Sequence, residues 1–251
     1  MTSLLVATLN IRNIADRWEE RLPLLLADFA ALQPDVIGLQ EVVFAVGQDR
    51  LLAAAGASRY EIRRSWAGRP EYGNTMLVRD RVANRLAPAR ESDRTDLAWT
   101  RSAHQVELDV EGGPLRLVNT HLHHLRPDVE IRDRQVSHLL DWLAGLPEVP
   151  VTVVTGDFNA HPEEPGIQRM RDAGFRSAFV ETNGAEPDQT YPSGIVAPMT
   201  DPGSPLTIDY IWLRGPVRAT SARLVFDRPA ATDHTLYPSD HVGVVAEIEV
   251  G

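Results

Sequence analysis

The sequence contains no cysteine and no lysine among its 251 residues. Without thiols it can form no disulfide, no thiolate metal site and no cysteine nucleophile, which fits a cytoplasmic protein. Without lysine it cannot form the phosphate-binding loop of P-loop proteins, because that motif needs a Gly-Lys pair. All 25 basic residues are arginines, which bind phosphate well, although a GC-rich genome explains the missing lysine better than function does.

Other absences exclude further classes of protein. No apolar run reaches the roughly 18 residues of a membrane-spanning helix, and the N-terminal stretch MTSLLVATLN lacks the basic segment that opens a signal peptide. Neither G-x-G-x-x-G after the first apolar run nor G-x-S-x-G occurs, so dinucleotide-binding and serine-hydrolase chemistry lack their motifs. The net charge of −10 argues against a broad nucleic-acid-binding surface. It does not exclude a nuclease, because carboxylates that bind a metal make a catalytic cleft acidic.

What is present is a series of short apolar runs rich in β-branched residues. Several of these runs alternate apolar and polar residues, which is typical of half-buried strands. The predicted strands cover residues 4–9, 35–40, 74–79, 104–110, 116–121, 151–156, 208–213, 222–226 and 242–250. Gly112 and Gly113 separate two of these runs, as in a hairpin.

Three longer segments, 16–33, 127–146 and 163–174, carry apolar residues at helical spacing and predict helices. Asp16 is placed to cap the start of the first helix, and Gly174 is placed to end the third. Because proline fits only the first turn of a helix, Pro23 predicts either a late start or a kink in the first helix.

The mixed order of strands and helices predicts an α/β sandwich, with two sheets packed face to face and helices outside them. A chain of this length fits one large α/β domain or two small ones. No segment has the composition of a linker, so we expect residues 1–251 to form a single domain. The segment 182–207 is rich in proline, glycine and serine. Its length is typical of a functional loop, and a mobile surface loop explains it as well.

Polar residues of similar chemistry stand at the ends of these apolar runs. Taken singly, an Asp or Asn in such a place forms a turn, and a histidine is a structural residue. Because sheet ends gather in space and carry binding loops, the collection predicts one shared cleft. It comprises Asn10, Glu41, His121, Asp157, Asn159, Asp209, Asp240 and His241. Asp157 and Asn159 would point into this cleft together if their segment stays extended.

The chemistry of this set favours a hard cation. Carboxylate and amide oxygens without cysteine suit Mg²⁺ or Mn²⁺. The histidine cluster HLHH at 121–124 lacks the spacing of zinc motifs, and we interpret His123 and His124 as loop or surface residues. A hard cation beside two histidines predicts phosphoester hydrolysis: the metal neutralises a phosphate oxygen, one group activates water and another supports the departing oxygen.

The ordered segments TLN, LQE, NTHL, GDFNA, IDYIW and SDHVGVV resemble those of the endonuclease/exonuclease/phosphatase superfamily, over residues 10–241. Each segment alone is unspecific, whereas the complete set in this order is highly specific. The resemblance implies a four-layered α/β/β/α sandwich of two mixed, mainly antiparallel sheets flanked by helices. It also implies a divalent-metal-dependent phosphoesterase.

The resemblance further implies a metal site. Glu41 would be the principal ligand of Mg²⁺ or Mn²⁺, with Asn10 and Asp240 beside it. Asp157 would orient or deprotonate the attacking water, and Asn159 would hold the phosphate or that water.

The remaining roles implied by the resemblance concern histidines and the substrate. Asp209 would pair with His241, fixing its tautomer and raising its basicity. His121 would donate a hydrogen bond to phosphate or assist the leaving group. Arg101 would contact phosphate, although a solvated arginine at a strand start explains it equally well, and Asn74 would face the cleft.

Where members of the superfamily place an acid that supports the histidine at position 121, this chain has Tyr72, with Glu71 one residue away. Glu71 would support His121 only if a β-bulge brought it into the position of Tyr72.

These observations favour a cytoplasmic, monomeric phosphodiesterase or phosphatase without stable membrane insertion. A DNA or RNA nuclease is the first alternative, for which the basic-aromatic segment 61–66 would contact nucleic acid, unless it is a solvated strand edge. A binding protein on a decayed catalytic fold is the second, and the complete set of polar residues argues against it.

Overall fold

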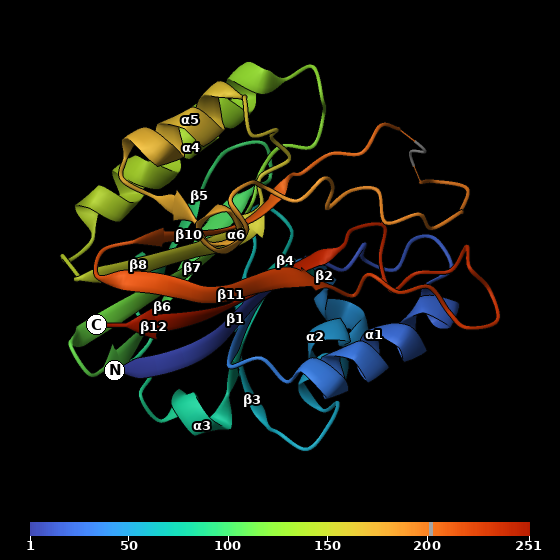
Figure 1. Ribbon diagram of the computed structural model, residues 1–251, viewed down its shortest axis with the longest axis horizontal. Helices are drawn as coiled ribbons and strands as arrows, with labels where there is room; N and C mark the ends of the chain where they lie inside the picture. The colour runs from blue at the N-terminus through green and yellow to red at the C-terminus, as the bar shows by residue number, and fades with distance from the viewer. Residues whose placement is uncertain (201–202) are drawn as a thin grey trace.

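The computed structural model describes residues 1–200 and 203–251, so residues 201 and 202 of the predicted 182–207 loop lie outside the described part. Two six-stranded sheets pack face to face (Figure 1). Helices cover the outer side of each sheet (Figure 1). This arrangement confirms the expected α/β/β/α sandwich.

The first sheet contains both the beginning and the end of the chain. Its strand order is β11-β12-β1-β2-β4-β3, in which β1 and β2 are parallel and the other neighbours antiparallel. The strands are β1 (Thr2–Asn10), β2 (Val36–Val43), β3 (Tyr60–Ser65), β4 (Tyr72–Arg79), β11 (Val217–Val225) and β12 (Gly243–Val250).

The second sheet is built from the middle of the chain. Its order is β5-β6-β7-β8-β10-β9, and only β7 and β8 among its neighbours are parallel. The strands are β5 (Arg94–Asp96), β6 (Ser102–Val110), β7 (Gly113–His121), β8 (Val151–Asp157), β9 (Arg176–Ser177) and β10 (Asp209–Arg214). Both sheets are therefore mixed and mainly antiparallel, as predicted.

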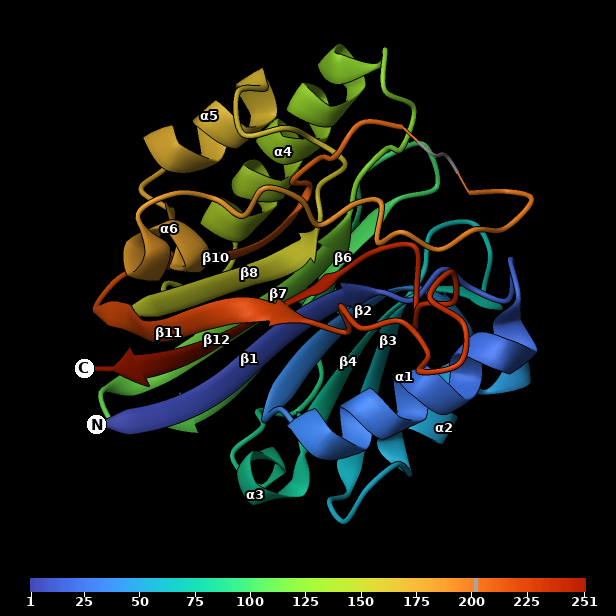
Figure 2. The same ribbon diagram turned by 45° about the vertical axis from the view of Figure 1, so that its right-hand side comes forward.

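The longer helices flank the sheets on opposite sides, with α1 and α2 on one side and α4 and α5 on the other (Figure 2). The helices are α1 (Trp18–Leu32), α2 (Gln48–Ala53), α3 (Asp80–Ala83), α4 (Val129–Gly145), α5 (Pro165–Asp172) and α6 (Ala178–Asn183), with short 3-10 turns at Phe44–Val46 and Glu91–Asp93. Within the described ranges, no helix is long and apolar enough to cross a membrane.

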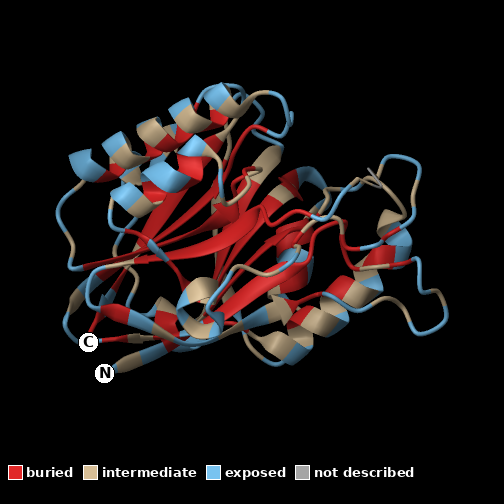
Figure 3. Ribbon diagram, turned by 45° about the horizontal axis from the view of Figure 1, so that its top comes forward, coloured by how far each residue is buried: buried red, intermediate tan, exposed pale blue. Residues whose placement is uncertain are grey.

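Three apolar clusters separate the four layers, and buried residues fill the central strands (Figure 3). In β1, Leu4 and Val6 belong to the cluster between the sheets, whereas Ala7 and Leu9 pack with Phe29 of α1. Alternate side chains point to opposite faces of a strand, so a strand buried on both faces must be apolar at nearly every position. This explains why some of the predicted strands contain continuous apolar runs, such as residues 4–7.

The start of α1 differs from the prediction. The residue before the helix is Arg17, in a left-handed conformation, and Asp16 does not cap it. The Asp16 carboxylate instead accepts hydrogen bonds from Arg12 and from the backbone of Met199. Pro23 lies inside α1 and does not delay its start. The predicted cap was therefore wrong, because Arg12 and Met199 bind the Asp16 side chain. Of the two alternatives for Pro23, the late start did not occur.

A close approach of β7 and β8 depends on Gly156, in the GDFN segment. A Cβ at this position would lie 2.2 Å from the carbonyl oxygen of Thr120 in β7. Only glycine permits that separation. It lets β7 and β8 pair through to their last residues, where His121 stands opposite Asp157.

We therefore expect Gly156→Ala to lower the free energy of unfolding by about 2 kcal/mol or more, because a backbone atom must move to admit the methyl group. Urea denaturation measures this change. Gly145→Ala is the matched control, since nothing lies within 4 Å of a Cβ at the end of α4. Equal stability of the two variants would contradict the role of Gly156.

Candidate active site

Strand register in the second sheet places three of the predicted site residues side by side. Asp157 at the end of β8 stands opposite His121 in β7 and opposite Asp209 in β10. Residues directly opposite in neighbouring strands project to the same face of a sheet. All three side chains are almost fully buried.

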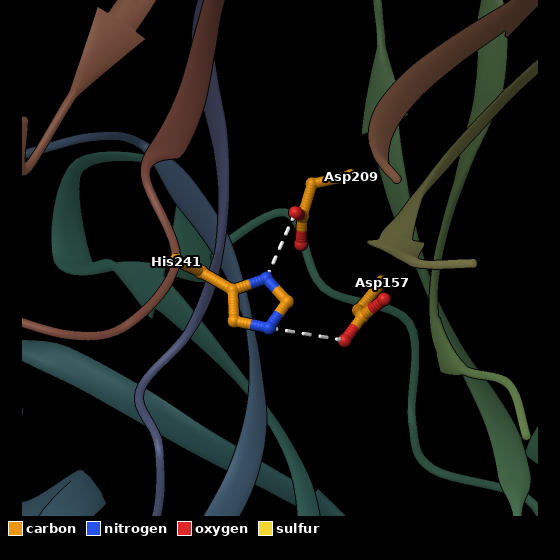
Figure 4. A group of neighbouring side chains, drawn as sticks. All are labelled: Asp157, Asp209 and His241. Atoms are coloured by element: carbon orange, nitrogen blue, oxygen red, sulfur yellow. Dashed lines mark hydrogen bonds and ion pairs between the residues drawn. The ribbon is translucent and has the colours of Figure 1, made fainter. Parts of the chain in front are cut away.

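The first sheet supplies the partners of this row. The side-chain amide of Asn10, at the end of β1, donates a hydrogen bond of 2.9 Å to Asp157. His241, just before β12, contacts both acids of the row (Figure 4). Its Nδ1 lies 2.9 Å from Asp209 and its Nε2 lies 3.7 Å from Asp157. The centre therefore forms only where the ends of the two sheets meet.

Burial and neighbouring charges set the protonation of this centre. Burial lowers the pKa of His241, but the Asp209 and Asp157 carboxylates outweigh it and raise that pKa to about 10. Burial, reinforced by Asp209, raises the pKa of Asp157 to about 7. Burial, helped by Arg101 and His241, lowers the pKa of His121 well below its usual value. At neutral pH His241 is thus a cation and His121 is neutral, so the 3.5 Å contact of His121 with Asp157 is not an ion pair.

A second acidic group lies beside the row. Glu41 occupies a left-handed backbone conformation (φ 59°) where the β2–β4 pairing is interrupted, and Asn13 donates to its carboxylate at 2.6 Å. The Asp240 carboxyl is buried; its Oδ2 has no hydrogen-bond partner in the described part of the chain and lies 3.2 Å from the Arg12 guanidinium. Strained backbone and a buried carboxylate oxygen without a hydrogen bond are features of functional sites.

This chemistry fits a hard divalent cation. Glu41, Asp240 and Asn10 line one cavity and offer oxygen atoms, which Mg²⁺ and Mn²⁺ prefer. Ligand atoms of Asp157, Asp209 and His241 also lie within 4.8 Å of one another. In that second group the Nδ1 of His241 is already hydrogen-bonded to Asp209, so the oxygen-rich group suits a hard cation better.

The cavity has a volume of about 420 Å³. Of the predicted set it is lined by Asn10, Glu41, His121, Asp157, Asn159, Asp240 and His241. Asp209 lies behind this surface, where it holds His241. Asn74 and Arg101 line a separate small pocket with Tyr72 and His121. The amide of Asn74 donates to the Ser102 carbonyl, and Arg101 donates to the Leu122 carbonyl and to His124.

The segment after β8 does not stay extended, contrary to the condition set on Asp157 and Asn159. Asn159 has a left-handed backbone (φ 50°), and its N–H donates to the Asp157 carboxylate at 2.8 Å. Its side-chain amide donates to the Leu122 carbonyl. Asp157 and Asn159 nevertheless line the same cavity, because the turn rather than strand alternation brings them together.

His123 and His124 lie in the loop after β7, as interpreted from the sequence. His123 is nevertheless buried, and its Nε2 lies 2.8 Å from Asp128. His124 is exposed and lines the cavity. Glu71 is exposed, and within the described ranges no hydrogen bond or ion pair joins it to His121. Tyr72 lines the small pocket with His121 instead.

Arg21 holds the walls of the cavity together, although the sequence did not predict this role. The buried guanidinium of Arg21 donates to carbonyls of the loop between β1 and α1 and to the Pro238 carbonyl, close to Asp240. It therefore ties the loop that carries Arg12 and Asn13 to the loop that carries Asp240. No local motif marks such a role. The burial of an arginine in an amphipathic helix becomes apparent only when the carbonyls that it binds are known.

A four-layered α/β/β/α sandwich whose sheet ends join a buried Asp–His pair to an acidic cavity belongs to the phosphoester hydrolases. The family model described as "Endonuclease/Exonuclease/phosphatase family" matches residues 7–241. The chain therefore belongs to this family, whose enzymes hydrolyse phosphoester bonds and depend on divalent metal ions.

Individual relatives agree with this assignment. Nocturnin from Xenopus laevis is 28% identical over 258 residues, covering 92% of this chain and 64% of the relative. The chain thus spans less than two thirds of that protein. Solved structures share the fold: D. rerio TDP2 complexed with single strand DNA product has a TM-score of 0.78 at 19% identity, covering 100% of each chain. The human Nocturnin catalytic domain with bound sulfate has a TM-score of 0.73 at 22% identity, covering 99% of this chain and 95% of the other.

The unusual protonation of His241 can be tested directly. Because the Asp209 carboxylate stabilises the imidazolium, Asp209→Asn should lower the pKa of His241 from about 10. The wild-type ring stays protonated as pH rises to about 10, whereas the variant ring loses its proton at lower pH. Histidine ¹H–¹⁵N NMR titration measures both. Asp227→Asn, which changes an exposed acid, is the control. An unchanged midpoint in Asp209→Asn would refute the pairing.

Proposed function

We propose that this chain is a divalent-metal-dependent phosphodiesterase or phosphatase, which hydrolyses its substrate by in-line attack of water. The arrangement around Asp157 carries the proposal. A single buried carboxylate is approached by His241, His121 and the amide of Asn10 at the wall of one cavity. Such convergence of an acid and two histidines on a cleft is typical of hydrolytic centres.

Glu41, Asn10 and Asp240 would hold Mg²⁺ or Mn²⁺. Their oxygen atoms support this assignment, as do the Oδ2 of Asp240, which has no hydrogen bond in the described part of the chain, and the orientation of Glu41 by Asn13. The bound ion would supply Lewis-acid neutralisation of a phosphate oxygen.

The residues of the chain would supply the proton transfers and hydrogen bonds. Asp157 would accept the proton of the attacking water, because a pKa of about 7 suits a general base near neutral pH. The His241 imidazolium, held by Asp209, would place positive charge beside the reacting phosphate. The Nε2 of His121, which has no hydrogen-bond partner among the described residues, would donate to the phosphate or the leaving oxygen.

Three further residues would position the substrate. Asn159 lines the same cavity as Asp157 and would hold the phosphate or the attacking water. Arg101, hydrogen-bonded to His124 at the cavity wall, would contact a phosphate oxygen, and Asn74 would support the pocket beside His121.

A nuclease is the alternative within the same family. The single strand DNA product bound to D. rerio TDP2 favours it. The basic segment 61–66 does not favour it, because Arg63 pairs with Glu61 and Arg64 pairs with Asp49. A binding protein without catalysis is less consistent with so complete a set of residues.

We also propose that residues 1–251 act as one cytoplasmic, monomeric catalytic domain without stable membrane insertion. The proposed centre takes residues from positions 10 to 241, which supports a single domain, and the absence of cysteine suits the cytoplasm.

Hydrolysis of bis-p-nitrophenyl phosphate tests the proposed reaction. We expect activity with Mg²⁺ or Mn²⁺ that disappears with a chelator. Asp157→Ala and His241→Ala should each lower kcat by roughly 100-fold or more, the scale of a lost general acid or base. His234→Ala, an exposed histidine, is the matched control. Wild-type rates in either site variant would show that the roles are assigned wrongly. A wild type inactive towards this ester, plasmid DNA, single strands, RNA, phospholipids and sugar phosphates would refute the proposed activity.

The metal site has a separate test. Glu41→Gln removes one negative charge while keeping the shape of the side chain, so Mg²⁺ affinity should fall by about 10-fold or more. Calorimetric titration with Mg²⁺ measures the affinity without relying on turnover. Glu148→Gln, an exposed residue in another loop, is the control. Unchanged affinity in Glu41→Gln would remove Glu41 from the proposed ligands.

A further inference from the structure

Trp99 is exposed in the loop between β5 and β6, two residues before Arg101. Its side chain is 61% exposed, whereas the other four tryptophans are buried or half-buried. Within the described ranges no hydrogen bond involves its indole, and its ring contact is with His123, at 5.6 Å between centroids. Apart from this contact the indole is open to solvent and offers a flat apolar surface.

The backbone holds Trp99 in this place at a cost. Ala98, Trp99 and Thr100 are three consecutive non-glycine residues with left-handed backbones, at φ 66°, 53° and 58°. Each such residue costs about 1 kcal/mol or more. The tight loop between β5 and β6 is closed by hydrogen bonds between Leu97 and Arg101 and between Arg101 and Ala98. The backbone that carries the exposed indole is therefore held in a defined conformation.

An aromatic series leads from Trp99 to the proposed phosphate site. The His123 ring, fixed by its hydrogen bond to Asp128, lies 5.4 Å from the His124 ring. His124 lines the cavity and accepts a hydrogen bond from Arg101, two residues after Trp99. Arg101 through its hydrogen bond, and Trp99 through the His123 ring, are thus both connected to His124 at the cavity wall.

We propose that Trp99 is a stacking platform for an unpaired nucleobase attached to the phosphoester. This inference rests on the proposed phosphoester hydrolysis, and it specifies the substrate as a nucleotide or as a single strand, the substrate of the nuclease alternative. Base–aromatic stacking tolerates any base, while a neighbouring arginine takes the phosphate. The net charge of −10 disfavours a long duplex, which needs an extended basic surface. The competing ligand is a lipid surface. Leu125 is exposed and lines the cavity, and together with Trp99 it would suit such a surface.

Binding of two matched strands tests this inference without turnover. The probes are fluorescein-labelled hexathymidylate and the same phosphate backbone with all bases replaced by abasic spacers, measured by fluorescence anisotropy in excess chelator. We expect wild type to bind the base-bearing strand more tightly. Trp99→Ala should weaken that binding by about 10-fold, the scale of one stacked base, and abolish the preference for bases. Trp99→Phe should keep most of the affinity and the preference for bases. Trp142→Phe, which changes a half-buried tryptophan of α4, is the control.

The outcomes separate this inference from the proposed reaction. Base-dependent binding lost in Trp99→Ala supports the platform even if no phosphoester is hydrolysed, which would refute only the reaction. Equal affinity of wild type and Trp99→Ala for hexathymidylate overturns the platform, whatever the activity. Binding of phosphatidylcholine vesicles that needs Trp99, without preference for bases, also overturns it and assigns the indole to a lipid surface.

Discussion

The pairing of β7, β8 and β10 is the constraint on which the proposed centre depends. It sets His121, Asp157 and Asp209 in one row across the sheet. A shift of one residue in any of these pairings would turn one side chain to the other face. The close approach that Gly156 permits therefore belongs to the chemistry as much as to the fold.

Burial of the row creates an electrostatic cost that the other sheet offsets. An isolated ionised carboxylate is unstable in an apolar interior. His241 and the amide of Asn10 arrive from the first sheet and supply a positive charge and a hydrogen bond. The two sheets are thus held together at this end by polar contacts, while apolar side chains join them elsewhere.

The sequence predicted the sandwich, its long strands and the polar residues that line the cavity, because alternation and polar strand ends are local patterns. It did not predict β3, whose residues were interpreted only as a basic-aromatic segment or a strand edge. It also did not predict the short elements β5, β9, α2, α3 and α6, which have too few residues to show a period. It also placed Asp16 at a helix cap, because a helical pattern does not report the competing donors, which are Arg12 in the same loop and the backbone of Met199 in a distant one.

The same limit applies within the site. The buried state of His123 depends on Asp128 and Trp99, and the arrangement of the loop after β1 depends on Arg21. Such contacts are formed by the tertiary structure, so no spacing in the sequence reports them.

The position of β12 has a consequence for how the protein folds. It lies between β1 and β11 and pairs with β1 from Thr2–Val250 to Thr8–Val244. Pairing over such a separation is slow, because the chain must close a long loop first. During synthesis β1 must wait with an unpaired edge until β12 leaves the ribosome, and Asp240 and His241 arrive with it. The centre is thus assembled late, and the unfinished chain lacks the residues needed for the reaction.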